Sequence, residues 1–155
     1  MKGRIVFAVL CVLTLVSFSV GQERGFGVGI ILGEPTGISA KGWVSSRNAI
    51  DAGLAWSFRE KAHFHLHADY LWHFPDVIRA PQQFTLFTGI GGRLAAGKGD
   101  GIFGVRIVGG VAWLPRNAPF DLFLEVAPIF DLIPATELRA NAGIGVRYFF
   151  SSSYR

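Results

Sequence analysis

Three side chains that could carry out chemistry alternate along one short segment of the sequence. His65, His67 and Asp69 occupy every second position, and His73 follows further along. On a β-strand this spacing places all four side chains on the same face. Imidazoles at this spacing could share a metal ion, and a histidine beside a carboxylate could act as a general base in a hydrolase.

A hydrolase at this row would also need a nucleophile or an activated water. The row itself contains no serine, and the candidates on neighbouring segments are Ser57 and Thr85. The other interpretation, which we favour, is a satisfied hydrogen-bond network in a sealed interior. We therefore predict no catalytic residue, no metal and no enzymatic activity. A lipid-modifying hydrolase that uses His65, His67 and Asp69 is kept as an alternative.

Two glycine-rich patterns imitate nucleotide-binding motifs. Gly99-x-Gly101-x-x-Gly104 matches the dinucleotide fingerprint, and residues 92–98 nearly match a P-loop, with Gly99 in place of the Ser or Thr that binds magnesium. Both motifs require a helix directly after the glycines, whereas strand-like alternation follows here. We interpret these glycines as turn residues and predict no cofactor.

Apolar residues recur at every second position in eight segments, a pattern typical of β-strands with one apolar face. The segments cover residues 26–32, 38–44, 50–58, 64–72, 84–94, 103–113, 122–130 and 138–150. The positions between them are rich in glycine, which suits the crowded lumen of a narrow barrel better than the water face of a soluble sheet. We predict an all-β fold, an eight-stranded antiparallel up-and-down transmembrane β-barrel with its apolar face toward lipid.

The same intervening positions carry nine charged residues, which we expect to form a network in the lumen. Arg106 and Glu125 lie on neighbouring segments and are plausible partners. Because buried charges must be paired and hydrogen-bonded, such a network would close the barrel rather than line a wide pore. The nine residues are Lys41, Asp51, Asp69, Arg93, Arg106, Asp121, Glu125, Arg139 and Arg147.

Proline and aromatic residues mark the ends of the segments. Only Pro128 lies within a segment, and because proline cannot donate to a β-ladder we expect a bulge or an early strand end there. If both termini are periplasmic, the aromatic residues fall into two bands, as in the girdles of membrane barrels. The inner band holds Phe26, Trp72, Phe84, Trp113, Tyr148 and Phe150, and the outer band holds Trp56, Phe58, Phe64, Phe103 and Phe130.

The first residues of the 155-residue chain form a separate unit. Lys2 and Arg4 precede an apolar run, and small residues follow it, so we predict a signal peptide over residues 1–21 and a barrel domain over residues 22–155. Cleavage would remove Cys11 and lower the net charge from +4 to +2. That balance gives no reason to expect nucleic-acid binding.

The last predicted strand carries a pattern that resembles the assembly signal of bacterial outer-membrane barrels. The matching residues are Asn141, Gly143, Val146 and Tyr148. The resemblance implies recognition by the barrel assembly machinery. The sequence departs from the usual signal because the chain continues past Phe150 to Arg155.

The chain as a whole resembles the small eight-stranded outer-membrane barrels, of the size of the outer-membrane protein A transmembrane domain, over residues 22–150. The sequence is similar to a family of small bacterial barrels that includes a spirochaetal member, and the similarity lies in residues 33–37, 48–54, 67–73 and 119–122. That member has been proposed to bind the host complement regulator factor H. The resemblance implies relatives rather than an activity.

These features together predict an integral protein of the bacterial outer membrane, exported through the Sec system. We expect a closed, non-enzymatic, monomeric barrel with a structural or surface-binding role. Its expected partners are outer-membrane lipid and the assembly machinery, with an extracellular protein partner left open. The alternatives are the hydrolase described above and an exported lipocalin-like binder of apolar ligands, which would place the apolar residues inside.

Overall fold

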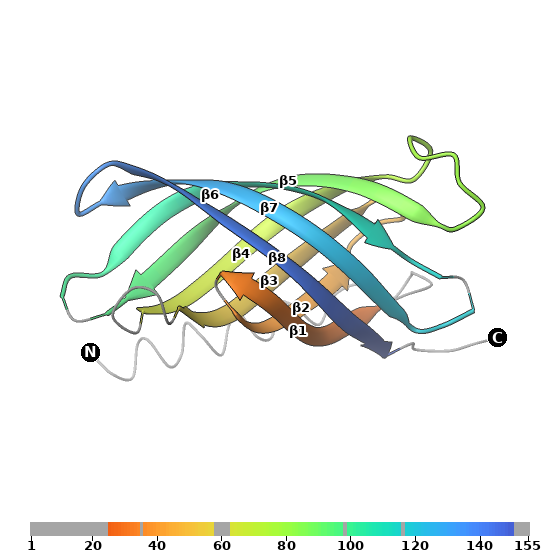
Figure 1. Ribbon diagram of the computed structural model, residues 1–155, viewed down its shortest axis with the longest axis horizontal. Coiled ribbons are helices and arrows are strands. Elements are labelled where there is room, and N and C mark those ends of the chain that lie inside the picture. Colours follow the sequence, from red (N-terminus) through yellow and green to blue (C-terminus); the bar gives the residue numbers. More distant parts are fainter. Residues whose placement is uncertain (1–24, 35, 58–62, 98, 116, 151–155) are drawn as a thin grey trace.

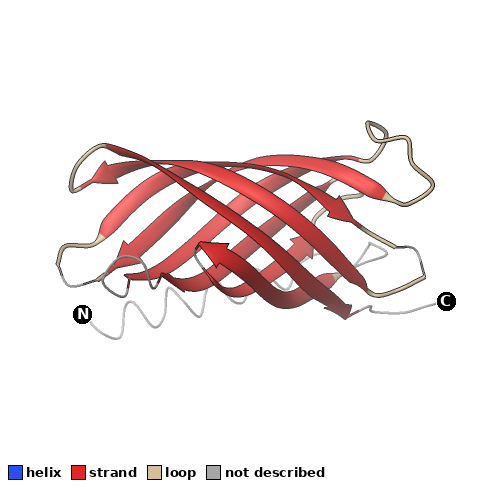
Figure 2. Ribbon diagram, in the orientation of Figure 1, coloured by secondary structure: helices blue, strands red, loops and turns tan. Residues whose placement is uncertain are grey.

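The computed structural model describes residues 25–34, 36–57, 63–97, 99–115 and 117–150. The predicted signal peptide and Phe58 lie outside these residues. Regular structure in the described part consists of eight β-strands, drawn in red in Figure 2. They are β1 (Phe26–Glu34), β2 (Thr36–Trp43), β3 (Asn48–Ser57), β4 (His63–Phe74), β5 (Phe84–Ala96), β6 (Ile102–Trp113), β7 (Phe120–Ile133) and β8 (Glu137–Phe150).

Each strand pairs with the next in antiparallel fashion, and β8 pairs with β1 to close the sheet (Figure 1). The predicted all-β fold, an eight-stranded antiparallel up-and-down barrel, is confirmed. We call the end that holds Phe26 and Phe150 the terminal end, and the other the opposite end. The described part of the chain contains no helix that is long and apolar enough to cross a membrane.

The expected interruption at Pro128 is wrong. β7 continues through Pro128 to Ile133, and Pro128 is paired with Ala140 of β8. The proline coincides with a local gap in the ladder to β6 but does not shift its register. The register shift between β6 and β7 lies instead between Phe103 and Gly104, close to the end of β7.

The β1–β2 hairpin is shorter than the rest of the wall. A single residue separates Glu34 from Thr36, and the ladder between β1 and β8 ends where Glu34 meets Ala142. Residues 137–141 of β8 extend beyond that point and are paired with β7 only. In Figure 1 the tip of β1 accordingly lies well short of the β5–β6 and β7–β8 connections. The wall is therefore lower at the opposite end over β1 and β2.

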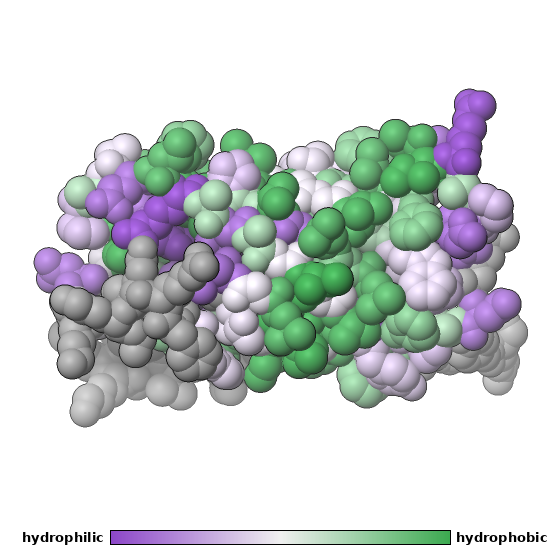
Figure 3. Space-filling model, in the orientation of Figure 1, coloured by the Kyte–Doolittle hydropathy of each residue, from purple (hydrophilic) through white to green (hydrophobic). Residues whose placement is uncertain are grey.

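Side chains alternate between the two faces of the sheet, and the large apolar ones lie outside. Ile30, Leu32, Leu124 and Ile144 are each at least half exposed. Apolar side chains, green in Figure 3, form a broad band across the visible face, and purple polar side chains gather toward the ends. The charged side chains between them in sequence point into the barrel and are mostly buried. The barrel thus has an apolar outside and a polar inside.

Candidate functional site: the charge network inside the barrel

The inward face carries all nine charged residues from which the sequence predicts a network. Strand alternation directs them inward because their neighbours in sequence are the apolar residues of the outer face. The structure buries eight of the nine, and Arg139, near the opposite end, is 30% exposed. The eight buried residues are Lys41, Asp51, Asp69, Arg93, Arg106, Asp121, Glu125 and Arg147.

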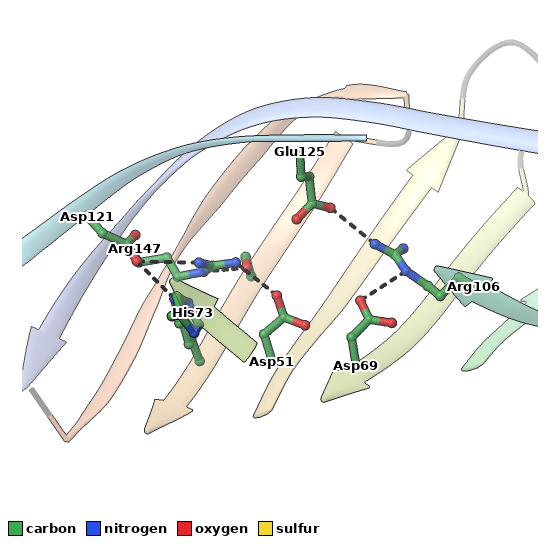
Figure 4. Close-up of polar contacts among 9 residues, drawn as sticks. Asp51, Asp69, His73, Arg106, Asp121, Glu125 and Arg147 are labelled. Carbon is green, nitrogen blue, oxygen red and sulfur yellow. Dashed lines mark hydrogen bonds and ion pairs between the residues drawn. The ribbon is translucent and has the colours of Figure 1, made fainter. Parts of the chain in front are cut away.

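Arg147 of β8 is the hub of the part of the network nearer the terminal end (Figure 4). Its guanidinium forms ion pairs with Asp51 at 3.1 Å and Asp121 at 3.5 Å. Its Nε donates a hydrogen bond to Ser39 Oγ at 2.8 Å. Asp121 also lies 3.7 Å from Lys41 Nζ. Arg147 therefore joins β8 to β2, β3 and β7 through the lumen.

Arg106 of β6 forms the next part of the network. Its Nε lies 3.0 Å from Asp69 Oδ2, and its Nη2 donates to Glu125 Oε1 at 3.2 Å. Arg106 and Glu125, plausible partners from their sequence positions, are in direct contact. The two parts meet where Asp51 and Asp69 lie opposite each other in the ladder between β3 and β4. We refer to the seven residues together as the central chain: Lys41, Asp121, Arg147, Asp51, Asp69, Arg106 and Glu125.

A second group of charges lies toward the opposite end, and we call it the far-end group. Arg93 donates two hydrogen bonds to Asp131, from Nε at 3.0 Å and from Nη2 at 2.7 Å. Arg139 contacts Asp131 at 3.2 Å and Glu137 at 2.9 Å. The far-end group therefore consists of Arg93, Asp131, Arg139 and Glu137, with two charges of each sign.

The sequence prediction missed four residues of the network. Asp131 was missed because Pro128 was expected to disturb the strand, although Asp131 keeps the alternation of Asp121 and Glu125. Glu137 starts β8 one position before the first predicted apolar residue. Ser39 is uncharged and His73 was assigned to the histidine row, so charge patterning could not identify them as partners of Arg147 and Lys41.

The histidine row is divided among different partners. His73 Nε2 lies 2.9 Å from Lys41 Nζ, and its Nδ1 lies 3.1 Å from the backbone oxygen of Arg47. His65 Nδ1 lies 3.4 Å from Arg93 Nη1. The ring of His67 packs over Gly53. The row therefore contributes to several separate contacts rather than to one site.

The arrangement does not assemble the hydrolase considered from the sequence. Asp69, which would have to orient His67, is ion-paired with Arg106 instead. Thr85 lies at the terminal end of β5, two positions before Phe87. Phe87 is paired with His73, so Thr85 lies beyond the end of the histidine row. The side chain of Ser57 is outside the described residues. Among the residues that the structure describes, no group of three or more His, Cys, Asp or Glu side chains could hold a metal ion.

Apolar side chains fill much of the lumen that the charges leave. Phe87, Phe123 and Phe149 are buried, and the Arg147 guanidinium lies 3.8 Å from the centre of the Phe123 ring. Glycines opposite these rings make room for them, because a Cβ at Gly145 would collide with the Phe123 ring. The inward face is thus a packed core of mixed polarity, with an aromatic component that the sequence analysis did not foresee.

Two solved structures resemble this barrel. The crystal structure of the N-terminal β-barrel domain of Pseudomonas aeruginosa OprF matches with a TM-score of 0.60 and 12% identity, covering 81% of this chain and 96% of that one. The crystal structure of Neisserial surface protein A (NspA) matches with a TM-score of 0.54 and 14% identity, covering 81% and 94%. The fold is that of these two barrels.

Comparison by sequence adds nothing to this likeness. No protein-family model matches the chain, and no curated protein matches it. At identities of 12% and 14% the two structures show a shared fold and nothing about function. The charged side chains of the interior are arranged as counter-ions for one another.

Proposed function

We propose that this protein is an integral barrel of the bacterial outer membrane, closed by its internal charge network, with a structural or surface-binding role and no enzymatic activity. The observation that carries the proposal is the inverted distribution of side chains. Large apolar residues cover the outside, and the charged residues are buried inside. Water would penalise this distribution, whereas lipid requires it.

The apolar outer face is large enough for a membrane, and aromatic residues border it at both ends. Soluble monomers rarely expose contiguous apolar patches above a few hundred Å², whereas here exposed apolar residues occur on all eight strands. Trp72, Phe84 and Tyr148 lie toward the terminal end, and Phe64 and Phe103 lie toward the opposite end. Such bands suit the two membrane interfaces. A lipocalin-like barrel would need the reverse arrangement, with its apolar face inside.

The packed interior supports a closed barrel rather than a pore. Arg106 and Arg147 are each 1–2% exposed and bridge carboxylates on different strands. The rings of Phe87, Phe123 and Phe149 occupy further space. An eight-stranded barrel is just wide enough for side chains to fill or for one small ligand, and because side chains fill it here, the lumen leaves little room for solute.

Short connections argue against a large adhesive surface and restrict any surface role. With periplasmic termini, the opposite end faces the outside, and its connections are short: residue 35 and residues 58–62, 97–101 and 134–136. An extracellular protein partner would therefore contact the rim rather than long loops. The spirochaetal resemblance identifies relatives, one of which has been proposed to bind factor H, and binding of a partner of that kind to this chain is a separate hypothesis.

Export and assembly complete the proposal. The signal peptide over residues 1–21 would direct the chain to the Sec system, and β8 would present Asn141, Gly143, Val146 and Tyr148 to the barrel assembly machinery. Val146 and Tyr148 are exposed on the outer face, where a recognising protein could reach them. We expect the assembled barrel to be a monomer in contact with outer-membrane lipid.

Fractionation of a Gram-negative host tests the membrane location. We expect the full chain in the outer-membrane fraction, resistant to carbonate extraction, with different gel mobility before and after boiling. Recovery in the carbonate-soluble fraction would contradict the proposal. Planar-bilayer recording of the purified barrel tests closure, and steady high conductance would show that the network does not seal the lumen.

A substitution on the outer face separates a membrane barrel from a soluble one. Leu124 is 52% exposed, so in water Leu124→Arg would be nearly neutral. In lipid we expect it to cost about 2–4 kcal/mol of folding free energy, as for arginine near the midplane of other barrels. Refolding titrations into lipid vesicles measure the cost, with Leu124→Ala as the control. Equal stability of the two variants would argue against lipid at this face.

A further inference from the structure

The charges along the central chain alternate in sign except at one place. The chain runs Lys41, Asp121, Arg147, Asp51, Asp69, Arg106 and Glu125, with an ion pair at every step except the one from Asp51 to Asp69, which lie opposite each other in β3 and β4. The exception lies between Asp51 and Asp69, where two carboxyl groups are neighbours. The chain contains three cations and four carboxyl groups, so it has one negative charge too many if every group is ionised.

Asp51 and Asp69 lie directly opposite each other in β3 and β4. Opposed residues in an antiparallel pair have Cβ atoms about 4.5–5.5 Å apart, and like charges at this distance destabilise a sheet. Both residues are 2% exposed. Because opposed side chains in a ladder project to the same face, the two carboxyl groups are neighbours inside the barrel. Figure 4 shows them side by side between the two arginines.

Each of the two carboxyl groups also keeps an oxygen without a donor. Oδ1 of Asp51 and Oδ1 of Asp69 are buried and have no hydrogen-bond partner among the described residues. Arg147 and Arg106, which contact the pair, each also contact a second carboxyl group, that of Asp121 or Glu125. The arginines therefore do not supply a whole positive charge to each member of the pair.

Among the residues that the structure describes, the surroundings offer no spare cation. The charged and titratable groups near the pair come from β2, β4, β6, β7 and β8, and they are Lys41, His67, Arg106, Asp121, Glu125 and Arg147. The far-end group is balanced within itself, since Arg93 and Arg139 face Asp131 and Glu137. Any compensation must therefore arise within the central chain or at His67.

We propose that Asp51 and Asp69 form a proton-binding site and share one proton at neutral pH. The protonated carboxyl donates its O–H to the ionised one, and the excess negative charge of the central chain disappears. Two carboxyl groups that share a site characteristically behave in this way. The inference goes beyond the proposed function because it concerns the protonation of the interior and holds wherever the barrel resides.

Infrared spectroscopy of the refolded full chain tests the proposal. We expect the carbonyl band of a protonated carboxylic acid in the wild-type barrel at neutral pH, with the shift that deuterium exchange produces. Asp51→Asn and Asp69→Asn should each abolish the band, because the remaining carboxyl then faces a neutral amide and an arginine. Asp131→Asn is the matched control, a buried ion-paired carboxylate outside the pair, and should leave the band unchanged.

Several outcomes would overturn the proposal. A wild-type spectrum without the band would mean that another group, such as a charged His67 or a bound cation, balances the chain. A band that survives both pair variants but disappears in Glu125→Gln would place the proton on Glu125. The wild-type spectrum decides the matter even if a variant fails to fold, and it is independent of where the barrel resides in the cell.

The shared proton also makes a thermodynamic prediction. Both aspartates are ionised in the unfolded chain above about pH 6, so folding of the wild type takes up a proton. Linkage then requires the ratio of the wild-type folding constant to that of Asp69→Asn to fall about tenfold per pH unit. Denaturant titrations between about pH 6 and pH 7.5, where the unfolded aspartates are ionised and the folded pair holds its proton, measure this ratio, and a ratio independent of pH there would contradict the shared proton.

Discussion

The central chain and the far-end group use the same residue types in different surroundings. The central chain is enclosed, with Arg106, Arg147 and Asp121 no more than 2% exposed. In the far-end group, Glu137 is 56% exposed and Arg139 is 30% exposed, while Arg93 and Asp131 are buried. Burial makes an unpaired charge costly, and water makes an exposed pair weak. The comparison therefore predicts a gradient of importance along the lumen.

The largest effect is expected at the hub of the central chain. Arg147→Ala would leave Asp51 and Asp121 without their shared guanidinium and would uncover the Phe123 ring. Removing one partner of a buried ion pair costs about 3–5 kcal/mol. Urea titration of the barrel refolded into detergent or lipid measures the loss. If the variant were as stable as the wild type, the ion pairs of the central chain would not be buried strongly enough to matter for stability.

A double-mutant cycle on Arg106 and Glu125 gives the next largest effect. Each single change to alanine should destabilise the barrel, because it leaves a buried charge with fewer partners. The double variant should cost less than the two singles together, with an interaction energy of about 0.5–3 kcal/mol. Strictly additive losses would show that the contact contributes nothing of its own.

A conservative substitution examines the buried half of the far-end group. Arg93→Lys keeps the charge but cannot reproduce the two hydrogen bonds to Asp131. We expect a loss of about 1.5–3 kcal/mol, the range for hydrogen bonds to charged groups. The same denaturant titration measures the loss. Arg93→Ala removes the charge as well as the two hydrogen bonds and should cost more, so the difference between the two variants gives the contribution of the charge.

The smallest effect is expected at the exposed edge of the far-end group. Arg139→Ala removes contacts with Asp131 and Glu137, but Asp131 keeps Arg93 as a partner. We expect a loss of no more than about 1 kcal/mol, reduced further at high salt. If Arg139→Ala were as damaging as Arg147→Ala, the gradient between the two groups would be wrong.

The strands and the direction of their side chains were predictable because alternation extends through all eight segments. One physical constraint, a continuous apolar outer face on a closed sheet, determines the position of every second residue. The far end of β7 was harder to predict, because Pro128 argues locally against a strand. The ladder to β8, in which Pro128 pairs with Ala140, keeps the strand continuous.

The partners inside the lumen were less accessible to sequence reasoning. Arg147 reaches Asp51 across two intervening strands. The positions level with Arg147 carry Gly29 in β1 and Ser39 in β2, both small, and Asp51 lies in β3 two residues before the partner of Ser39. That contact depends on the register of four strands together. Alternation shows which residues point inward but not how far the strands are staggered. The contact between Arg106 and Glu125 was more accessible because β6 and β7 are neighbours.

The short β1–β2 hairpin has a consequence for the lipid around the barrel. The wall over β1 and β2 ends at Glu34 and Thr36, while β8 continues to Glu137. In the proposed membrane setting, hydrocarbon tails have less apolar wall to cover on this flank than elsewhere. Lipids respond to such a mismatch by local thinning, at a modest cost per ångström. The barrel would thus be surrounded by a bilayer of uneven thickness, thinnest beside the seam where its first and last strands meet.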